Sequence, residues 1–180
     1  ITRNCVPPEK CGFFRPGSVY IANVDGKKEE VVYVAPDAKA VPNLIKELLA
    51  WCLKAENESL SPILEAGLFH YQFATIHPFT DGNGRSARTL ATFILYKRGY
   101  NFRKLFALDD FYNEHRKEYY KALQTGETYD SRKGTDLTNW LEFFTDGFIF
   151  EMRRIKEKII TLSLTPQLKG AKEKVYLNSL

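Results

Sequence analysis

The stretch covering residues 77–88 constrains the fold of this chain more than any other part of the sequence. Pro78 disfavours the α region at the residue before it, so a helix that arrives from upstream has to end at His77. Gly82 and Gly84 permit positive φ angles and a close approach of the backbone to a ligand. We therefore expect two helices joined here by a tight polar loop.

The residues of this loop are suited to binding an anion. Asn83 tolerates the left-handed region, and successive backbone amides in such a turn form an anion-binding nest. A helix that begins near Gly84 directs its free N–H groups and the positive end of its dipole to the same place. Arg85 and Arg88 share one face of its first turn, where the helix itself does not favour cations. An external anion is therefore expected to compensate them.

Two further side chains give the loop a capacity for chemistry. Asp81 is its one carboxylate, and Mg²⁺ is usually held by one or two carboxylates together with substrate phosphates. His77 has the only side chain in the stretch whose ordinary pKa lies near neutrality, which suits a general base. Phe79 is expected to be a buried anchor. The sequence thus predicts a polyphosphate-binding loop with a base at one edge.

Other interpretations of the loop have weaker support. Residues 82–87 also match the dinucleotide-binding fingerprint G-x-G-x-x-A, but that motif follows a strand within a βαβ unit, and here the preceding residues have a helical pattern. A plain turn between two helices accounts for the glycines but not for the ionisable side chains. A zinc site formed by His70, His77 and Asp81 fits helical spacing, although no HExxH pattern or cysteine cluster accompanies it. We expect His70 instead to be a core residue or one that supports the site.

The rest of the chain predicts a mainly α-helical domain with one β-hairpin. Residues 19–22 and 31–34 are short β-prone runs, and the Asp25-Gly26 pair between them is a turn signal. Beyond them, apolar residues recur at helical spacing. The expected helices run from about residue 43 to 52, 62 to 77, 84 to 98, 110 to 123 and 137 to 159.

The composition is that of a single globular domain. The chain has 180 residues, and its 44% apolar content, with thirteen Phe and ten Tyr, can build a sizeable core. A net charge of +4 suits an anionic ligand but is too weak to imply nucleic acid by itself. Cys5, Cys11 and Cys52 give no disulfide framework. With no secretory signal and no long apolar run, we expect a soluble, cytoplasmic protein.

On these residues, the sequence resembles the Fic-domain family. Residues 77–88 match the family signature H-x-F-x-[DE]-G-N-G-R-x-x-R at every fixed position. The resemblance covers most of residues 10–160 and implies a mainly α, Fic-type helical bundle, with a small β-hairpin flap at about residues 19–34 beside the active-site loop. The other segments that follow the family order are Gly12-Phe13-Phe14-Arg15, the hairpin, the helix with Trp51, Ser61-Pro62 followed by His70, and Glu118-Tyr119-Tyr120.

The resemblance implies a specific activity. Most Fic domains with this signature move AMP from ATP to a hydroxyl of a target protein. His77 would deprotonate the Ser, Thr or Tyr hydroxyl, and Asp81 would hold the Mg²⁺. The residues implied for nucleotide binding are Asp81, Gly82, Asn83, Gly84, Arg85, Ser86, Arg88, Tyr119 and Tyr120, and those of the flap that would dock the target are Val31, Val32 and Tyr33.

Alternatives to this activity stay open. One is transfer of another phosphate-containing group, such as UMP, GMP, phosphocholine or a phosphoryl group. Another is a ligand-sensing regulatory or DNA-binding protein. The expected partners are ATP and a target protein, with the chain itself as one candidate target and a homo-oligomer as one candidate assembly. No membrane partner is expected, and nucleic acid only through a flanking domain.

The resemblance also bears on the ends of the chain. We expect an irregular segment over residues 1–17, a Fic-type catalytic domain over residues 18–162, and a linker or the start of a truncated C-terminal region over residues 163–180. Many Fic proteins carry an inhibitory helix with the pattern [ST]-x-x-x-E-[GN]; the nearest segment, residues 61–66, is broken by Ala66. In the intact protein we expect an inhibitory segment before this domain and a winged helix after it.

Overall fold

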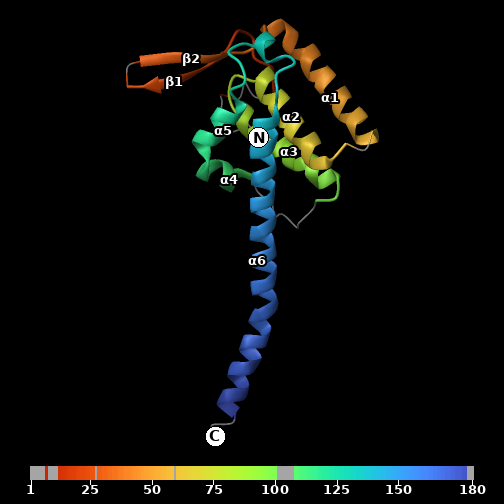
Figure 1. The fold of residues 1–180 in the computed structure, drawn as a ribbon, viewed down its shortest axis with the longest axis vertical. Helices are drawn as coiled ribbons and strands as arrows, with labels where there is room; N and C mark the ends of the chain where they lie inside the picture. Colours follow the sequence, from red (N-terminus) through yellow and green to blue (C-terminus); the bar gives the residue numbers. More distant parts are fainter. Residues whose placement is uncertain (1–6, 8–11, 27, 59, 101–107, 178–180) are drawn as a thin grey trace.

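A computed structural model describes residues 7, 12–26, 28–58, 60–100 and 108–177, and within the last helix it describes side chains as far as Thr161 (Figure 1). The described part is mainly α-helical with one hairpin, which confirms the predicted fold class. Its elements are β1 (Tyr20–Asp25), β2 (Lys28–Val34), η2 (Ala38–Ala40), α1 (Val41–Asn57), α2 (Pro62–Ile76), α3 (Asn83–Lys97), α4 (Leu108–Glu114), α5 (Arg116–Leu123), η3 (Asp130–Arg132) and α6 (Thr138–Leu177).

The hairpin projects from the helical body (Figure 1). Its antiparallel register pairs Tyr20 with Val34 at the base and Asp25 with Lys28 near the tip. An irregularity between Ile21 and Ala22 leaves Val32 without a Cα partner, so the strand contains a bulge. Bulges occur often beside active sites, because they redirect side chains.

The helices α2 and α3 follow the predicted boundaries. Proline occupies the first turn of α2, directly after Ser61, where its missing N–H costs no helical hydrogen bond. The helix ends at Ile76, and His77 then adopts the left-handed conformation. Gly82, at φ 82°, precedes the first residue of α3. The predicted pair of helices with a tight loop between them is confirmed.

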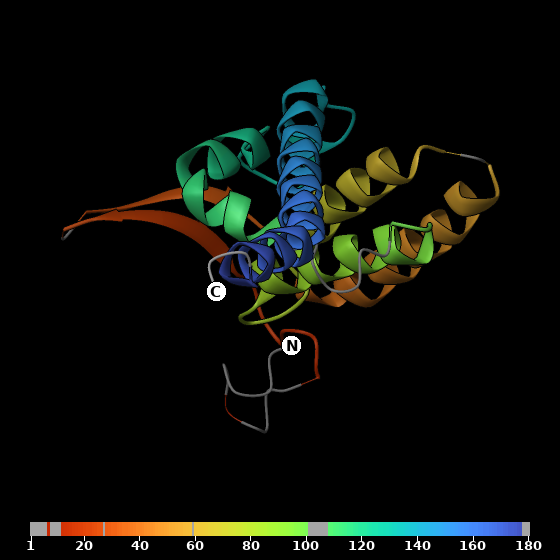
Figure 2. The ribbon, with the colours of Figure 1, turned by 90° about the horizontal axis from the view of Figure 1, so that it is seen from below.

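The core surrounds α2, which contacts α1, α3 and α6. The indole N–H of Trp140 donates to the Gly67 carbonyl at 2.8 Å, which joins α6 to α2. A Cβ atom at Gly67 would lie 3.1 Å from the ring of Phe144, so the glycine permits this close approach. Viewed from below, α6 lies between two groups of elements, with the hairpin, α4 and α5 on one side and α1 and α3 on the other (Figure 2).

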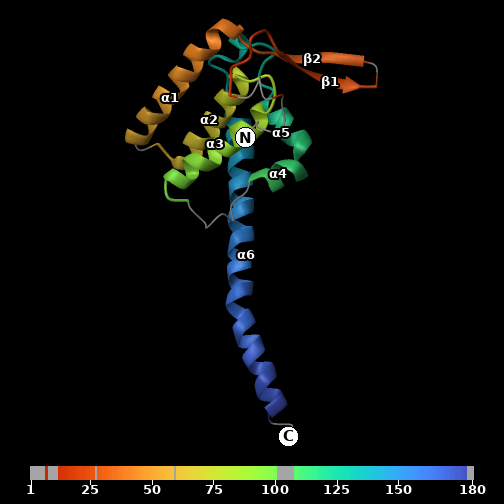
Figure 3. The same ribbon diagram turned by 180° about the vertical axis from the view of Figure 1, so that it is seen from behind.

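Two predictions about the helices are wrong in detail. The helix expected at residues 110–123 is split into α4 and α5, because His115 has φ −111° and ψ 40°. The last helix was expected to end near residue 159, but the backbone of α6 stays helical to Leu177 and projects from the body (Figures 1 and 3). Pro166 removes one intrahelical hydrogen bond, and the helical turns before and after it continue. The domain boundary at residue 163 stays a prediction.

The structure bears on two expectations from the composition, which concern the cysteines and the absence of a long apolar run. Cys5 and Cys11 lie outside the described residues, whereas Cys52 is a free thiol. Among the described helices, none combines the length and the apolar character needed to cross a bilayer.

Candidate active site

The loop between α2 and α3 is closed by the side chain of Asn83. Its Oδ1 accepts from the Phe79 amide and its Nδ2 donates to the Phe79 carbonyl, both at 2.8 Å. Asn83 is 2% exposed. The Asn83 side chain therefore holds the loop in shape, and its direct contribution to a bound anion would come from the backbone amide.

Both predicted phosphate-binding arginines are paired with carboxylates. Arg85 forms an ion pair of 3.2 Å with Asp81 within the loop. Arg88, one turn further along α3, binds Asp109 of α4 through its Nε. The first turn of α3 contains no acidic residue that could interact favourably with the positive end of the helix dipole. An incoming polyphosphate would thus compete with two internal carboxylates for these guanidinium groups.

The geometry of His77 fits a proton acceptor. Its Nδ1 lies 3.2 Å from the Ala74 carbonyl, which can only accept, so Nδ1 carries the proton in this hydrogen bond. Nε2 is then the basic nitrogen of the neutral ring. Burial lowers the pKa of His77, and the nearby cations Arg15 and Arg132 lower it further. The imidazole is therefore neutral at neutral pH, as a general base has to be.

His77 lines a pocket of about 530 Å³ between the hairpin, the α2–α3 loop and α5. Of the predicted site residues, the pocket lining includes Val32, Tyr33, His77, Gly84, Arg88, Tyr119 and Tyr120. Its other lining residues include four polar or charged ones that were not predicted, Asn23, Arg116, Gln124 and Arg132. The predicted residues that lie in or beside the loop without lining the pocket are Asp81, Gly82, Asn83, Arg85 and Ser86.

The two adjacent tyrosines of α5 have different environments. Tyr119 is 5% exposed, accepts a hydrogen bond from Arg88, and its hydroxyl lies 3.1 Å from Nε2 of His70. Tyr120 is 52% exposed, and the guanidinium of Arg116 lies 5.8 Å from its ring centroid. Tyr119 therefore supports Arg88, while Tyr120 offers the open ring. His70 is fully buried, which confirms it as a core residue that supports the site.

The three predicted flap residues also differ. Val31 is 50% exposed and Val32 lines the pocket, whereas Tyr33 is 1% exposed. The Tyr33 hydroxyl donates to the Thr75 carbonyl at 2.6 Å, and the guanidinium of Arg132 lies 3.6 Å from its ring centroid. Tyr33 is thus the anchor of the hairpin on α2, and its side chain is not available to a docked target.

The carboxylate of Asp81 fits a magnesium ligand. It is 55% exposed and belongs to the loop between α2 and α3. Mg²⁺ is commonly held by one or two carboxylates, with phosphate oxygens and water completing its shell. The zinc alternative is wrong, because the part of the chain that the structure describes contains no group of three or more His, Cys, Asp or Glu residues placed for a metal.

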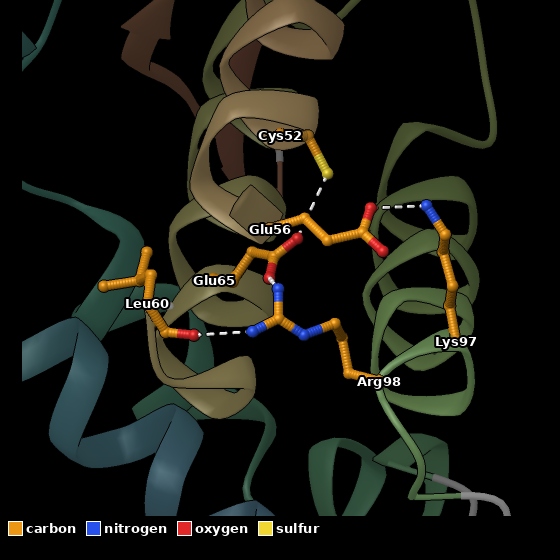
Figure 4. Close-up of polar contacts among 6 residues, drawn as sticks. All are labelled: Cys52, Glu56, Leu60, Glu65, Lys97 and Arg98. Atoms are coloured by element: carbon orange, nitrogen blue, oxygen red, sulfur yellow. Dashed lines mark hydrogen bonds and ion pairs between the residues drawn. The ribbon is translucent and has the colours of Figure 1, made fainter. Parts of the chain in front are cut away.

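Residues 61–66, the nearest match to an inhibitory pattern, lie at the start of α2. Glu65 is buried and binds Arg98, at the end of α3 opposite to the active-site loop, at 2.7 Å (Figure 4). The thiol of Cys52 is hydrogen bonded to the same carboxylate. Glu65 therefore joins α1, α2 and α3 and does not approach Arg88.

Sequence reasoning assigned no role to Arg15, Asp109 or Arg132. Arg15 is 3% exposed, and its Nε donates to the carbonyl of His77, 62 positions later in the chain. Arg132 lies in a segment that resembles a polar loop in sequence, yet it is 9% exposed. Their partners are distant in sequence or are backbone atoms, so no local pattern could have identified them.

Comparison with known proteins agrees with this fold. Residues 7–95 match the Fic/DOC family. A protein adenylyltransferase Fic from Nematostella vectensis is 34% identical over 93 residues, which cover 52% of this chain and 20% of that protein. The protein adenylyltransferase fic-1 of Caenorhabditis briggsae is 34% identical over 105 residues, which cover 56% and 20%.

Solved structures show the same likeness. The crystal structure of a Fic family protein from Desulfovibrio desulfuricans superimposes with a TM-score of 0.66 at 30% identity, over 89% of this chain and 44% of that one. Fic-1 from C. elegans superimposes with a TM-score of 0.64 at 26% identity, over 92% and 41%. The chain therefore resembles the Fic/DOC family in the sequence of residues 7–95 and in its fold. It spans about a fifth of the length of the curated relatives described above.

Proposed function

We propose that this chain is a protein adenylyltransferase that moves AMP from ATP to a Ser, Thr or Tyr hydroxyl of a target protein. The observation that carries the proposal is the position of His77. Its Nδ1 is held by the Ala74 carbonyl, which leaves Nε2 as the basic nitrogen of a ring that lines the same pocket as Gly84 and Arg88. A base thus lies beside a predicted polyphosphate loop, and two curated relatives are named as protein adenylyltransferases.

In the proposed reaction, the hydroxyl oxygen of the target attacks the α-phosphorus of ATP. Nε2 of His77 accepts the hydroxyl proton, the bond from oxygen to phosphorus forms, and the bond to pyrophosphate breaks with its electron pair on the leaving group. Such a transfer depends mainly on positioning and on stabilisation of charge. Arg85, Arg88 and the amides that follow Gly82 would neutralise the phosphates.

Asp81 would hold the Mg²⁺ that accompanies ATP. When bound, the ion would neutralise phosphate charge and help to orient the phosphate groups. Arg85 would then release Asp81 and turn to the phosphates, because its present ion pair is exposed and therefore weak.

The hairpin would present the target. An extended segment of the target would add as a strand beside it, a mode in which main-chain hydrogen bonds give affinity for varied sequences. Val31 and Val32 would meet its side chains, because Val31 is exposed and Val32 faces the pocket. The exposed ring of Tyr120 would stack on the base of the nucleotide.

The test is incubation of the protein and Mg²⁺ with each α-labelled nucleotide and with candidate targets, followed by the mass of the adduct. The proposal predicts a gain of AMP. A gain of UMP, GMP or a bare phosphoryl group would instead indicate another transferase. Tight ligand binding without an adduct would indicate a ligand-sensing regulatory protein and would refute the proposal.

A further inference from the structure

We propose that Arg15 is a positioning residue for this reaction: it fixes the backbone bend that presents the His77 imidazole and ties that bend to the base of the hairpin. This inference rests on the proposed function for its meaning, but its contacts are independent of it. Arg15 lies before β1, in a segment with no other predicted role.

The guanidinium of Arg15 donates hydrogen bonds to three backbone carbonyls. Nε donates to His77 at 2.9 Å, Nη1 donates to Gly17 at 2.7 Å, and Nη2 donates to Pro36. The backbone amide of Arg15 also donates to the Pro78 carbonyl at 2.9 Å. The planar guanidinium can satisfy several acceptors in fixed directions, which an ammonium group cannot do.

The bend at His77 needs such support. His77, at φ 52°, is the one non-glycine residue with positive φ in the described part of the chain. A residue other than glycine is strained in this region and persists only where its surroundings enforce the conformation. Arg15 binds the carbonyl of His77 itself, and its amide binds the next carbonyl, so both sides of the bend are held.

The same side chain reaches the hairpin. Pro36 follows β2 by two residues and is buried. Through its carbonyl, Arg15 joins the exit of the hairpin to the carbonyl of the proposed base. A displacement at either end would move the imidazole relative to a target held on the hairpin, and about 1 Å of misplacement can cost on the order of 10² in rate.

Arg98 supplies a matched control. It is also a largely buried arginine, and it donates to the Leu60 carbonyl at 2.9 Å and to Glu65 at 2.7 Å (Figure 4). It lies at the end of α3 opposite to the active-site loop, and its hydrogen bonds to Glu65 and Leu60 involve neither His77 nor the hairpin. Its replacement should disturb the fold without moving the site.

The first experiment compares Arg15→Lys and Arg15→Gln with Arg98→Lys and Arg98→Gln. We expect both Arg15 variants to lower kcat by about 10²-fold while KM for ATP changes by less than about threefold. The Arg98 variants are compared with Arg15 variants of similar free energy of unfolding, and each kcat is corrected for the folded fraction. Their kcat should stay within about threefold of the wild-type value. Equal kcat losses in the two pairs would overturn the proposal.

The second experiment needs no transfer activity, and its first measurement needs no variant. In the wild-type protein, the Arg15 Nε–H should exchange with solvent as slowly as core amides and show a scalar coupling to the His77 carbonyl carbon. In folded Arg15→Lys, NMR of the ring nitrogens should show loss of the single Nδ1–H tautomer of His77. Fast exchange of the Nε–H, or an unchanged His77 tautomer, would refute the role of Arg15. If the wild type transfers no nucleotide, the proposed function fails while this test of Arg15 still stands.

Discussion

His77 has two properties that a base requires and that its place in the chain alone would not provide. Its left-handed backbone turns it out of α2 at a point where the following proline already disfavours the helix. Its ring is partly buried, which lowers its pKa and keeps it neutral at neutral pH. The hydrogen bond from Nδ1 to Ala74 selects the nitrogen that accepts the proton.

Replacement of His77 should separate chemistry from binding. His77→Ala should lower the rate of transfer by at least about 10²-fold, the usual contribution of a general base, while the Kd for Mg-ATP stays within a few fold. His77→Asn is the matched variant, because Asn tolerates the left-handed region. Transfer is followed with labelled ATP and binding by calorimetry. Parallel losses of transfer and binding in the Asn variant would show that His77 is structural.

The role of Asp81 should appear in the effect of magnesium on nucleotide affinity. Asp81→Asn keeps an oxygen for the Gly82 amide but removes the negative charge. We expect Mg²⁺ to strengthen ATP binding in the wild type and to have little effect in the variant. Titrations of ATP with and without Mg²⁺ measure the gain in affinity that the ion provides. If Asp81→Asn shows the same gain as the wild type, Asp81 is not the metal ligand.

Asp109 should weaken nucleotide binding, because it occupies Arg88. The pair is partly exposed, so its removal is worth about 0.2–1 kcal/mol, and Asp109→Asn should tighten ATP binding by a factor of about 1.4 to 5. Asp110→Asn is the control, because the neighbouring carboxylate pairs with Arg154 instead. If both variants bind ATP as the wild type does, Asp109 does not compete with the phosphates.

At the scale of the elements, the buried side chain of Tyr33 anchors the hairpin on α2. Tyr33→Phe should lower the free energy of unfolding by about 1 kcal/mol, because the Thr75 carbonyl loses its donor while the stacking on Arg132 is kept. Tyr20→Phe on the neighbouring strand removes a hydroxyl from a side chain that is 57% exposed and should change little. Urea unfolding measures the free energy of unfolding of both variants. An equal decrease in the two would contradict the role of Tyr33 as an anchor.

The elements that the sequence predicted are those with local signals. The proline and glycines around the loop marked the end of α2 and the start of α3, and the Asp-Gly pair marked the hairpin turn. The break at His115 was missed because no proline or glycine accompanies it. Arg15 and Arg132 were missed because they bind backbone atoms that the fold brings near. Tyr33 was assigned to target docking because burial cannot be read from its place in a β-prone run.

At the scale of the whole molecule, the site rests on an aromatic core around His70. The ring of His70 meets those of Tyr112, Tyr119 and Trp140, and Tyr119 in turn contacts Arg88. Helix α6 contributes Trp140 and contacts α2 and α5, so these two pocket-lining helices share one support.

This core should make stability depend on pH. Burial lowers the pKa of His70 to about 3, so in acid the unfolded chain binds a proton that the folded chain does not. Stability is therefore complete above the ordinary pKa of about 6.5 and falls as the pH drops from there toward 3, by about 1.4 kcal/mol for each pH unit within the window. His70→Phe should flatten this dependence in urea unfolding at pH 7.5, 5.5 and 4.5. An equal loss of stability with acid in both proteins would exclude His70 as its source.

The most direct test of the account is a crystal structure of the protein with Mg²⁺ and a non-hydrolysable ATP analogue. We predict that the phosphates lie against the amides after Gly82 and the guanidinium of Arg88, with Nε2 of His77 directed at the side of the α-phosphorus opposite pyrophosphate. A triphosphate bound elsewhere, or an imidazole turned away from it into the core, would contradict the proposed reaction.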